Sequence, residues 1–350
     1  MKSNTTNNTH LWVKSIKAED LVKGYYLARA KRVGRTKNGD PFLSITLSDR
    51  TGDVEARVWE RAEEFTSLFK EGNVIYVEGQ GNLYRNRVQL TLTSLKAGDG
   101  GGDPSIFLEK TEKNVKKMME FLRSTVDATR NSHLKALINN FLADHHFVSL
   151  FKTAPAAKNF HHNYIGGLLE HTVAVCRMAG AVADHYPELD RDLLMAGAIL
   201  HDIGKTREFK FDTHIDYSDE GRLLGHLTLG VAMVDDKLAA LKTFPVDLAL
   251  RLKHLILSHH GQYDFGSPKR PKFLEAFALH LIDDLDAKMN GLGRFMGKDP
   301  HEGVWTDFNK LFQRYFLKGA IPGPEEKKSP IHNQDDRQKV LFSPLLPETE

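Results

Sequence analysis

The sequence predicts a multidomain α+β fold, in which an N-terminal five-stranded β-barrel precedes an all-α domain. Up to residue 97, apolar residues recur at every second position, the period of a strand with one buried face. Beyond residue 105 they recur every three or four positions, the period of a helix. Between the two lies AGDGGGDP at 97–104, whose four glycines and one proline can continue neither pattern.

The chain therefore divides into four segments. We predict a barrel domain at 11–97, a glycine-rich linker at 98–104, a helical domain at 105–320 and a flexible polar tail at 321–350. In the barrel domain, alternation is clear at 42–47, 54–58 and 88–92, and a helical stretch at about 60–69 follows the third strand. Five strands with a helix between the third and fourth are typical of an OB-fold, a small Greek-key barrel. Trp59 and Tyr76 are expected in its core or its seam.

The helical domain is predicted to contain no strand. Helices are expected at 166–186, 192–203, 223–241, 246–260 and 271–290. Gly204 and Gly261 are placed just past helix C-termini, and Pro271 fits a first helical turn.

Composition restricts the class of protein. A hydrophobic content of 41% and a charged content of 27% are typical of a soluble globular chain. No apolar stretch approaches the ~20 residues of a membrane span, and the first ten residues do not resemble a secretory signal. Cys176 is the single cysteine and can form no intrachain disulfide, which fits a reducing compartment. We therefore expect a cytoplasmic protein with no membrane partner; its net charge of +2 neither favours nor excludes nucleic acid.

Histidines gather in the helical half, where 14 of the 17 lie between residues 145 and 301. The candidate metal ligands are His171, His201, Asp202, His226, His259, His260 and Asp283. Neutral imidazoles with carboxylates suit first-row divalent ions, and the lack of thiolates argues against a structural zinc site. Adjacent residues on a helix diverge by about 100°, so His201 can hold one ion while the Asp202 carboxylate bridges two. Two such ions would activate water and clamp a phosphoryl group.

Each of these residues also has an ordinary structural explanation. His171 could be a packed or capping histidine, the His259–His260 pair a cation cluster at a helix end, and Asp283 part of a solvated face. All of them lie in apolar helices, however, where unpartnered polar side chains are costly, and this favours one shared site. Outside this set, Lys205 is either a phosphate contact or a solvated lysine. His161 and His162 either contact substrate or metal or serve the structure, and Glu170 is expected on the surface.

The order of these motifs resembles a known signature. GGLLEHT, AILHDIGK, GH, SHHG and LIDDLD together resemble the pattern of HD-superfamily metal-dependent phosphohydrolases. The stretch LSHHGQYDFGSPKRPKFLEAFALHLIDDLDAKM, with the OB-like first half, is similar to the YhaM family of bacterial 3′→5′ exoribonucleases over residues 11–316. The resemblance implies His171, His201, Asp202 and Asp283 as core ligands, with His226, His259 and His260 at a second ion. Asp283 is preferred to Asp284 and Asp286 because it aligns with the ligand aspartate of the superfamily.

Basic and aromatic residues of the first domain predict a nucleic-acid surface. In an OB-fold the first and fourth loops frame the binding face, and basic residues fall near both. The candidate contacts are Arg32, Arg35, Lys37, Phe42, Arg85 and Arg87. Phe42 lies on the strand face opposite Leu43, outside the predicted core, where it could stack on a base or pack against the helical domain. Alternatively, these charged residues lie in loops that contact only solvent.

The resemblance implies a metal-dependent 3′→5′ exonuclease that hydrolyses single-stranded RNA, with single-stranded DNA as an alternative, to nucleoside 5′-monophosphates. It implies two divalent ions, Mn²⁺ before Fe²⁺, Co²⁺ or Ni²⁺, with Asp202 and Lys205 in the catalytic roles. A phosphodiesterase of small or cyclic nucleotides is one rival, although no GYP tripeptide follows the HD motif. A nucleic-acid-binding regulator with a vestigial site is another, although all seven ligands are present. A homo-oligomer is left open.

Overall fold

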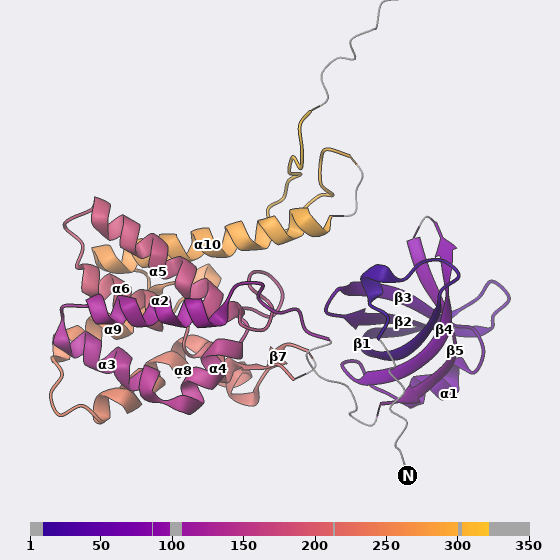
Figure 1. Ribbon diagram of the computed structural model, residues 1–350, viewed down its shortest axis with the longest axis horizontal. Helices are drawn as coiled ribbons and strands as arrows, with labels where there is room; N and C mark the ends of the chain where they lie inside the picture. Colours follow the sequence, from indigo (N-terminus) through magenta and orange to yellow (C-terminus); the bar gives the residue numbers. More distant parts are fainter. Residues whose placement is uncertain (1–9, 86, 99–106, 213, 300–302, 322–350) are drawn as a thin grey trace, which may run out of the picture. The chain divides into compact units, whose positions relative to one another are not determined.

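The computed structural model describes residues 10–85, 87–98, 107–212, 214–299 and 303–321. Its first part is a closed barrel in the strand order β1-β2-β3-β5-β4, with β3 and β5 parallel and the other pairs antiparallel (Figure 1). The barrel elements are β1 (Leu21–Arg35), β2 (Pro41–Asp49), β3 (Gly52–Val58), α1 (Ala62–Ser67), β4 (Val74–Tyr84) and β5 (Arg87–Ala97), preceded by the 3₁₀ turn η1 (Val13–Ser15). The predicted five-stranded OB-fold, with its helix between the third and fourth strands, is confirmed.

The core of the barrel follows the alternation in the sequence. Leu43, Ile45 and Leu47 of β2 are buried, as expected for one face of a strand. The prediction for Trp59 is wrong, because this residue follows the inward-facing Val58 and its side chain is 49% exposed. Tyr76 is likewise outside the core, since its neighbours on β4 point inward and its ring packs against Tyr25 at 5.2 Å.

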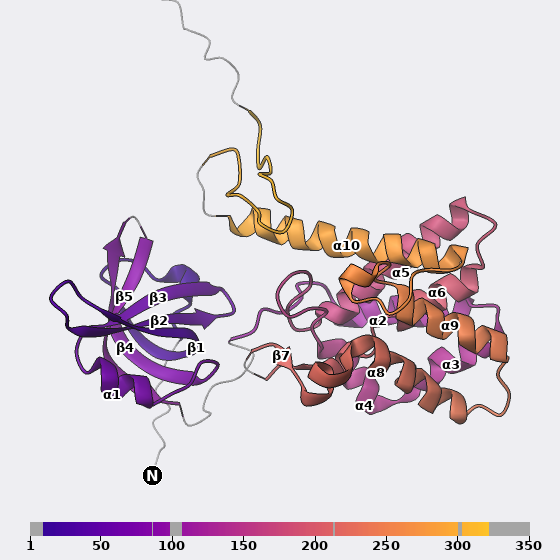
Figure 2. The ribbon, with the colours of Figure 1, turned by 180° about the vertical axis from the view of Figure 1, so that it is seen from behind.

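The second part is a bundle of helices (Figures 1 and 2). The helices are α2 (Val115–Ala128), α3 (Ser132–Ala143), α4 (His145–Thr153), α5 (Gly167–His185), α6 (Arg191–Leu200), α7 (Lys205–Glu208), α8 (Asp219–Ala239), α9 (Val246–Ser258) and α10 (Leu274–Lys298). The five expected helices correspond to α5, α6, α8, α9 and α10. Helices α2, α3 and α4 are not among the expected ones, although Asn114, Asn131 and Asp144 cap their N-termini with side-chain oxygens.

Three details of the bundle correct the sequence analysis. A two-stranded ribbon, β6 (Phe209–Lys210) with β7 (Asp216–Tyr217), lies where no strand is expected. Helix α8 is broken at Gly225, whose φ of 71° and ψ of 159° are not helical and favour glycine. Helix α10 begins at Leu274, so Pro271 precedes it and does not form its first turn.

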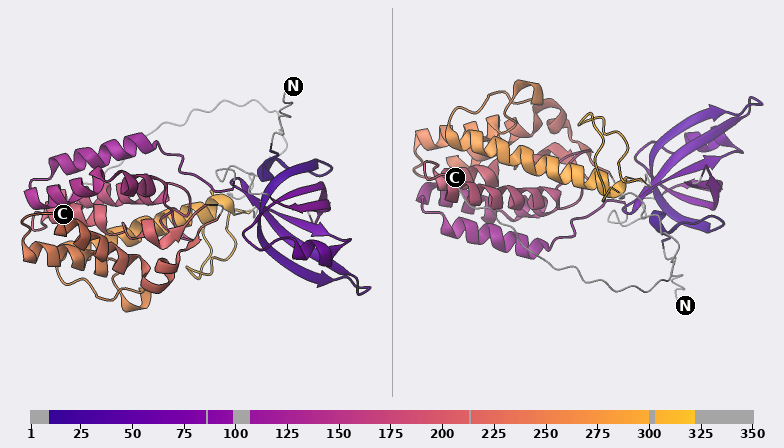
Figure 3. Two further views of the ribbon diagram at one scale, coloured as in Figure 1. Left: turned by 90° about the horizontal axis from the view of Figure 1, so that it is seen from below. Right: turned by 90° about the horizontal axis from the view of Figure 1, so that it is seen from above.

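Helices α5 and α10 bring the two ends of the predicted site together. Figures 1 and 3 show α10 along one side of the bundle, next to α5. The described residues 295–299 and 303–321 belong to a separate small unit, with bridges between Trp305 and Leu317 and between Asn309 and Arg314. The predicted linker and tail fall almost wholly on 99–106 and 322–350, outside the described residues, so the domain limits stay predictions. None of the described helices combines the length and the apolar character needed to cross a membrane.

Candidate metal centre

Helix α6 carries the His201–Asp202 pair into the interior of the bundle. Asp190 caps the start of α6, and every residue from Leu193 to Leu200 is buried, so the helix is surrounded by other helices. His201 and Asp202 follow directly and are 0% and 1% exposed. The Nδ1 atom of His201 lies 3.0 Å from the carbonyl oxygen of Ala198 and donates to it, which leaves Nε2 as an acceptor facing the centre.

A first group of ligand atoms forms around His201. We use "first group" for His171, His201 and Asp283, whose candidate ligand atoms lie within 4.8 Å of one another. The Nε2 atom of His171 lies 3.2 Å from Nε2 of His201 and 3.0 Å from Oδ1 of Asp283. Burial alone would lower the pKa of His171, but Asp283 and Asp286 raise it to about 9. The space between these atoms therefore requires a positive charge, either a proton or a metal ion.

A second group lies on the other side of Asp202. We use "second group" for His226, His259 and His260, which also meet within 4.8 Å. The Nε2 atoms of His226 and His260 are 3.2 Å apart. Each imidazole has a carbonyl or carboxylate oxygen for its Nδ1–H: Glu208 for His226, Ile256 for His259 and Phe265 for His260. All three Nε2 atoms are therefore acceptors that converge on one point, as metal ligands do.

Asp202 lies between the two groups. Its Oδ2 atom is 3.4 Å from Nε2 of His201, and its Oδ1 atom is 3.5 Å from Nε2 of His259 and 3.6 Å from Nε2 of His226. Burial works to raise the pKa of Asp202, yet Lys205 and His201 hold it well below the ordinary value, so the carboxyl is ionised. Asp202 Oδ1 and His259 Nε2 are buried without a hydrogen-bond partner among the described residues. Orphaned acceptors in this position fit a divalent cation.

Two further carboxylates hold the histidines in place. Asp286 Oδ2 accepts from His171 Nδ1 at 2.7 Å, and Glu208 Oε1 accepts from Nδ1 and from the backbone N–H of His226, each at 3.0 Å. Such partners fix the tautomer and orientation of a ligating imidazole. Sequence reasoning missed Glu208 and considered Asp286 only as a rival ligand. Of the three neighbouring aspartates, Asp283 lies in the first group, while Asp284 pairs with Lys288 at 2.7 Å.

The loop before α5 approaches the first group. His161 and His162 each have a buried Nδ1 atom with no hydrogen-bond partner among the described residues. His162 has a φ of 45°, in the left-handed region, which costs energy for a residue with a side chain. The loop fits against α5 because Gly167 has no Cβ; a Cβ there would lie 1.9 Å from the carbonyl oxygen of His162.

Two charged residues near the centre are buried. Lys205 is 7% exposed, and its Nζ atom donates to Asp202 Oδ2 at 2.6 Å. Glu170 was expected on the surface, but it is also 7% exposed; it accepts from Thr111 and pairs with Lys113 at 2.9 Å. The expectation fails because the segment preceding α2 covers this turn of α5, which helical periodicity cannot reveal.

Some of the basic residues of the barrel already have partners within the protein. Arg29 pairs with Asp53 at 2.9 Å, and Lys31 donates to the carbonyl oxygen of Thr66 at 2.7 Å. Of the predicted contacts, Arg32, Arg35, Lys37, Arg85 and Arg87 are exposed and Phe42 is half-buried. The ring of Phe42 lies 5.2 Å from that of Trp59, and the Arg57 guanidinium lies 5.1 Å from its centroid. Trp59 and Arg57 therefore extend this surface, although sequence reasoning missed them.

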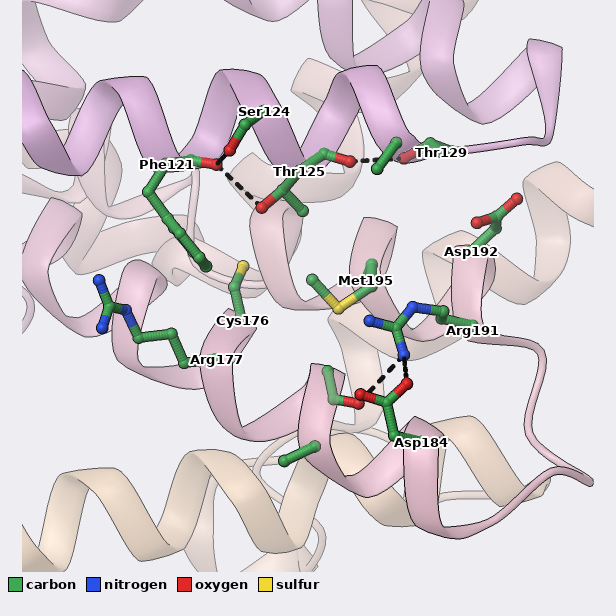
Figure 4. A pocket seen from close by; sticks show the side chains of 13 residues that line it. Phe121, Ser124, Thr125, Thr129, Cys176, Arg177, Asp184, Arg191, Asp192 and Met195 are labelled. Carbon is green, nitrogen blue, oxygen red and sulfur yellow. Dashed lines mark hydrogen bonds and ion pairs between the residues drawn. The ribbon is translucent and has the colours of Figure 1, made fainter.

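A hollow away from the centre has no evident ligand. It is lined by residues of α2, α5 and α6 and shares none with either group (Figure 4). Arg191 already bonds Asp184 and the carbonyl oxygen of Gly180, and Asp192 accepts backbone N–H groups of 130 and 131. Because these polar side chains are satisfied within the protein, we assign the hollow no ligand.

The fold and the centre together define a class of protein. Residues 12–97 match the OB-fold nucleic acid binding domain family, and residues 168–288 match the HD domain family. The chain is therefore an OB-fold domain joined to an HD domain, and the predicted HD-superfamily fold is confirmed.

Relatives along most of the chain narrow this class to one family. The 3′-5′ exoribonuclease YhaM of Bacillus velezensis is 38% identical over 274 residues, which cover 77% of this chain and 86% of that protein. The protein of the same name from Bacillus subtilis is 38% identical over 279 residues, covering 79% and 87%. That of a Geobacillus strain is 36% identical over 281 residues, covering 80% and 86%. The chain belongs to the YhaM family, as the motifs predict.

Proposed function

We propose that this protein is a metal-dependent 3′→5′ exoribonuclease, which shortens single-stranded RNA and releases nucleoside 5′-monophosphates. The observation that carries the proposal is the position of Asp202, a buried carboxylate with one oxygen toward each group of imidazoles. The relatives are named 3′-5′ exoribonucleases, which supports both the activity and its direction. Single-stranded DNA and the rival functions are not needed to account for the site.

We assign one divalent ion to each group. The proposed ligands are His171, His201 and Asp283 for the first ion, His226, His259 and His260 for the second, and Asp202 for both. Imidazole and carboxylate donors without thiolates suit Mn²⁺, with Fe²⁺, Co²⁺ and Ni²⁺ as alternatives. When bound, two such ions activate water and neutralise charge on a phosphoryl group.

The chain's own residues would prepare the site for a phosphodiester. Lys205 holds Asp202 Oδ2 and brings a fixed positive charge to the centre, where we propose that it contacts the scissile phosphate. Asp286 and Glu208 orient His171 and His226. We propose His161 and His162 as further contacts of substrate or metal. Buried nitrogens that lack a hydrogen-bond partner among the described residues, and a strained φ, are retained where a ligand recovers their cost.

The barrel would hold the strand upstream of the cleaved end. We propose that its exposed basic residues contact phosphates and that bases stack on Trp59 and Phe42. The proposed phosphate contacts are Arg32, Arg35, Lys37, Arg85 and Arg87.

We also propose a cytoplasmic location. We further propose a barrel domain at 11–97, a linker at 98–104, a helical domain at 105–320 and a tail at 321–350. Cys176 is the single cysteine of the sequence and can form no intrachain disulfide, which fits a reducing compartment. The barrel ends at Ala97 and the first helix after it begins at Val115, which supports a boundary between them.

The test uses purified protein, an RNA strand labelled at its 5′ end, and a series of divalent metals. We expect a descending ladder of products that a stable hairpin stops, and no ladder from His201→Ala or Asp202→Ala. Cleavage of a circular strand, which has no end, would overturn the exonuclease assignment. Strand binding without cleavage in any metal would favour a regulator, and hydrolysis confined to cyclic dinucleotides would favour the small-nucleotide phosphodiesterase.

A further inference from the structure

The outer face of α10 is apolar. Its inner face carries Asp283 and Asp286 to the metal centre and buries Leu279 and Ile282 in the core. The opposite face exposes five large apolar side chains, each between 51% and 61% accessible: Leu274, Phe277, Leu281, Leu285 and Met289. A helix at the edge of a bundle normally turns polar residues to solvent. Figures 1 and 2 show α10 at such an edge, so this outer stripe of α10 needs an explanation.

The five exposed residues are spaced by three or four positions, so they form one continuous face of α10. The heptad positions 274, 278, 281, 285, 288 and 292 run along this face and read Leu, Ala, Leu, Leu, Lys and Leu; Ala278 and Leu292 are half-buried and the other four are exposed. A seam with this repeat faces a second helix along its whole length. Phe277 and Met289 flank it and widen the apolar surface. Exposed apolar residues scattered singly need no partner, but five of them on one continuous face mark an interaction site.

The stripe is large enough to associate. Five half-exposed side chains of this size present on the order of 500 Å² of apolar surface, which is the size at which a patch marks an interaction site. Two copies of the stripe would together bury roughly 1,000 Å², the lower limit for a specific interface.

The seam matches that of a second copy of α10 placed antiparallel to it. With a second helix antiparallel and centred on position 283, Leu281 lies opposite the partner's Leu285, and Leu274 lies opposite the partner's Leu292. The long Lys288 then lies opposite the partner's Ala278, whose small side chain leaves room for it. In a parallel, in-register pair, each Lys288 would instead meet the partner's Lys288, and like charges would face each other in the seam.

We propose that two copies of this chain associate through the outer stripe of α10, antiparallel and about a twofold axis near position 283. A twofold contact uses the same patch on both copies, as this reversed match requires. The interface would lie on the helix that supplies Asp283, but on its opposite face, so it does not depend on the proposed catalytic activity.

The first experiment measures the mass of the full-length chain in solution at micromolar concentration, by light scattering or sedimentation equilibrium. We expect a dimer, and a monomer for Leu281→Glu/Leu285→Glu. Leu250→Glu on α9 is the matched control, since Leu250 is 61% exposed outside the stripe, and it should remain dimeric. Bound metal and helical circular dichroism should be unchanged in both variants. A monomeric wild type, or a dimer that survives the double substitution, would overturn the proposal.

A second experiment tests the register. Cys176 is 1% exposed, so an engineered thiol would have no accessible native competitor. We expect a mixture of Leu281→Cys and Leu285→Cys chains to form a disulfide-linked heterodimer on mild oxidation, and either variant alone to cross-link poorly. Efficient cross-linking of Leu281→Cys with itself would instead indicate a parallel pair and overturn the antiparallel arrangement.

The rival occupant of the stripe is the chain's own end. Residues 322–350 include the apolar sequence VLFSPLL at 340–346. If that segment covers the stripe, the full chain should be monomeric and a chain ending at residue 321 should dimerise. This result would overturn the proposal for the full-length protein, whereas equal dimerisation of both chains would support it.

Discussion

The two groups of the candidate metal centre place buried histidines in opposite electrostatic settings. In the first group, carboxylates outweigh burial and raise the pKa of His171 to about 9. In the second group, burial dominates and lowers the pKa of His260 to about 2. The difference follows from the neighbours: Asp283 and Asp286 bond His171, whereas His260 bonds a backbone carbonyl and lies beside two other imidazoles.

This contrast shows what Asp202 contributes. The first group has its own anionic ligand in Asp283, which can offset half the charge of a divalent ion before Asp202 contributes. The second group is formed by imidazoles alone, and its nearest carboxylate oxygen is Oδ1 of Asp202, 3.5 Å from His259. The second ion should therefore depend on Asp202 more than the first.

The largest effect is expected from Asp202→Asn, which removes the charge that both groups share. Hydrolysis of single-stranded RNA should fall at least ~100-fold, since the ligand proposed to serve both ions would be lost. Bound metal per chain should fall to one or less, measured by elemental analysis after dialysis. Asp284→Asn is the control, since Asp284 lies on α10 next to Asp283 but pairs with Lys288 at 2.7 Å. Two tightly bound ions in Asp202→Asn would contradict the shared role.

Removing one ligand from each group tests whether the halves are separate. His171→Ala and His260→Ala should each lose one ion and keep the other, and both should lose most activity because two ions act together. The ion kept by His171→Ala should dissociate more readily than the one kept by His260→Ala, since the second group has no carboxylate of its own. Chelator titrations of the two variants provide the comparison. If the ion kept by His260→Ala dissociates more readily, the number of imidazole ligands affects metal affinity more than the charge of the ligands does.

Smaller effects are expected from the carboxylates that orient the histidines. Asp286→Asn and Glu208→Gln should each weaken metal binding about 10- to 100-fold, the usual cost of losing such a partner. Each should affect its own half, because Asp286 bonds His171 and Glu208 bonds His226. Isothermal titration with Mn²⁺ would resolve the two sites. Unchanged affinity at both would mean that packing alone holds the rings.

Substitutions in the barrel should not change metal binding by either group of the metal centre. Replacing Arg35, Lys37, Arg85 and Arg87 with alanine should raise the apparent KM for long strands and reduce its dependence on salt, since each phosphate contact releases counterions. Metal content and the turnover of a dinucleotide should stay the same. An equal loss with long and short substrates would assign these residues to the structure of the protein and not to strand binding.

Several features of the fold are predictable because they depend on local periodicity. A period of two against a period of 3.6 separates the barrel from the bundle, and the same alternation that buries Val58 should have placed Trp59 outside. Helices α2, α3 and α4 carry capping residues that could have marked their starts. The β6–β7 ribbon is too short, at two residues a strand, to leave a periodic signal.

The sequence by itself determined the order of the motifs, the residue types at the centre and the family to which the chain belongs. Only the tertiary structure decided that Asp202 lies between two groups, that Glu208 bonds His226, and that Glu170 is buried. It also decided that the leucine seam of α10 faces outward while Asp283 faces the centre. Periodicity specifies which residues share a face, but the neighbour of that face is set by packing between segments far apart in the chain.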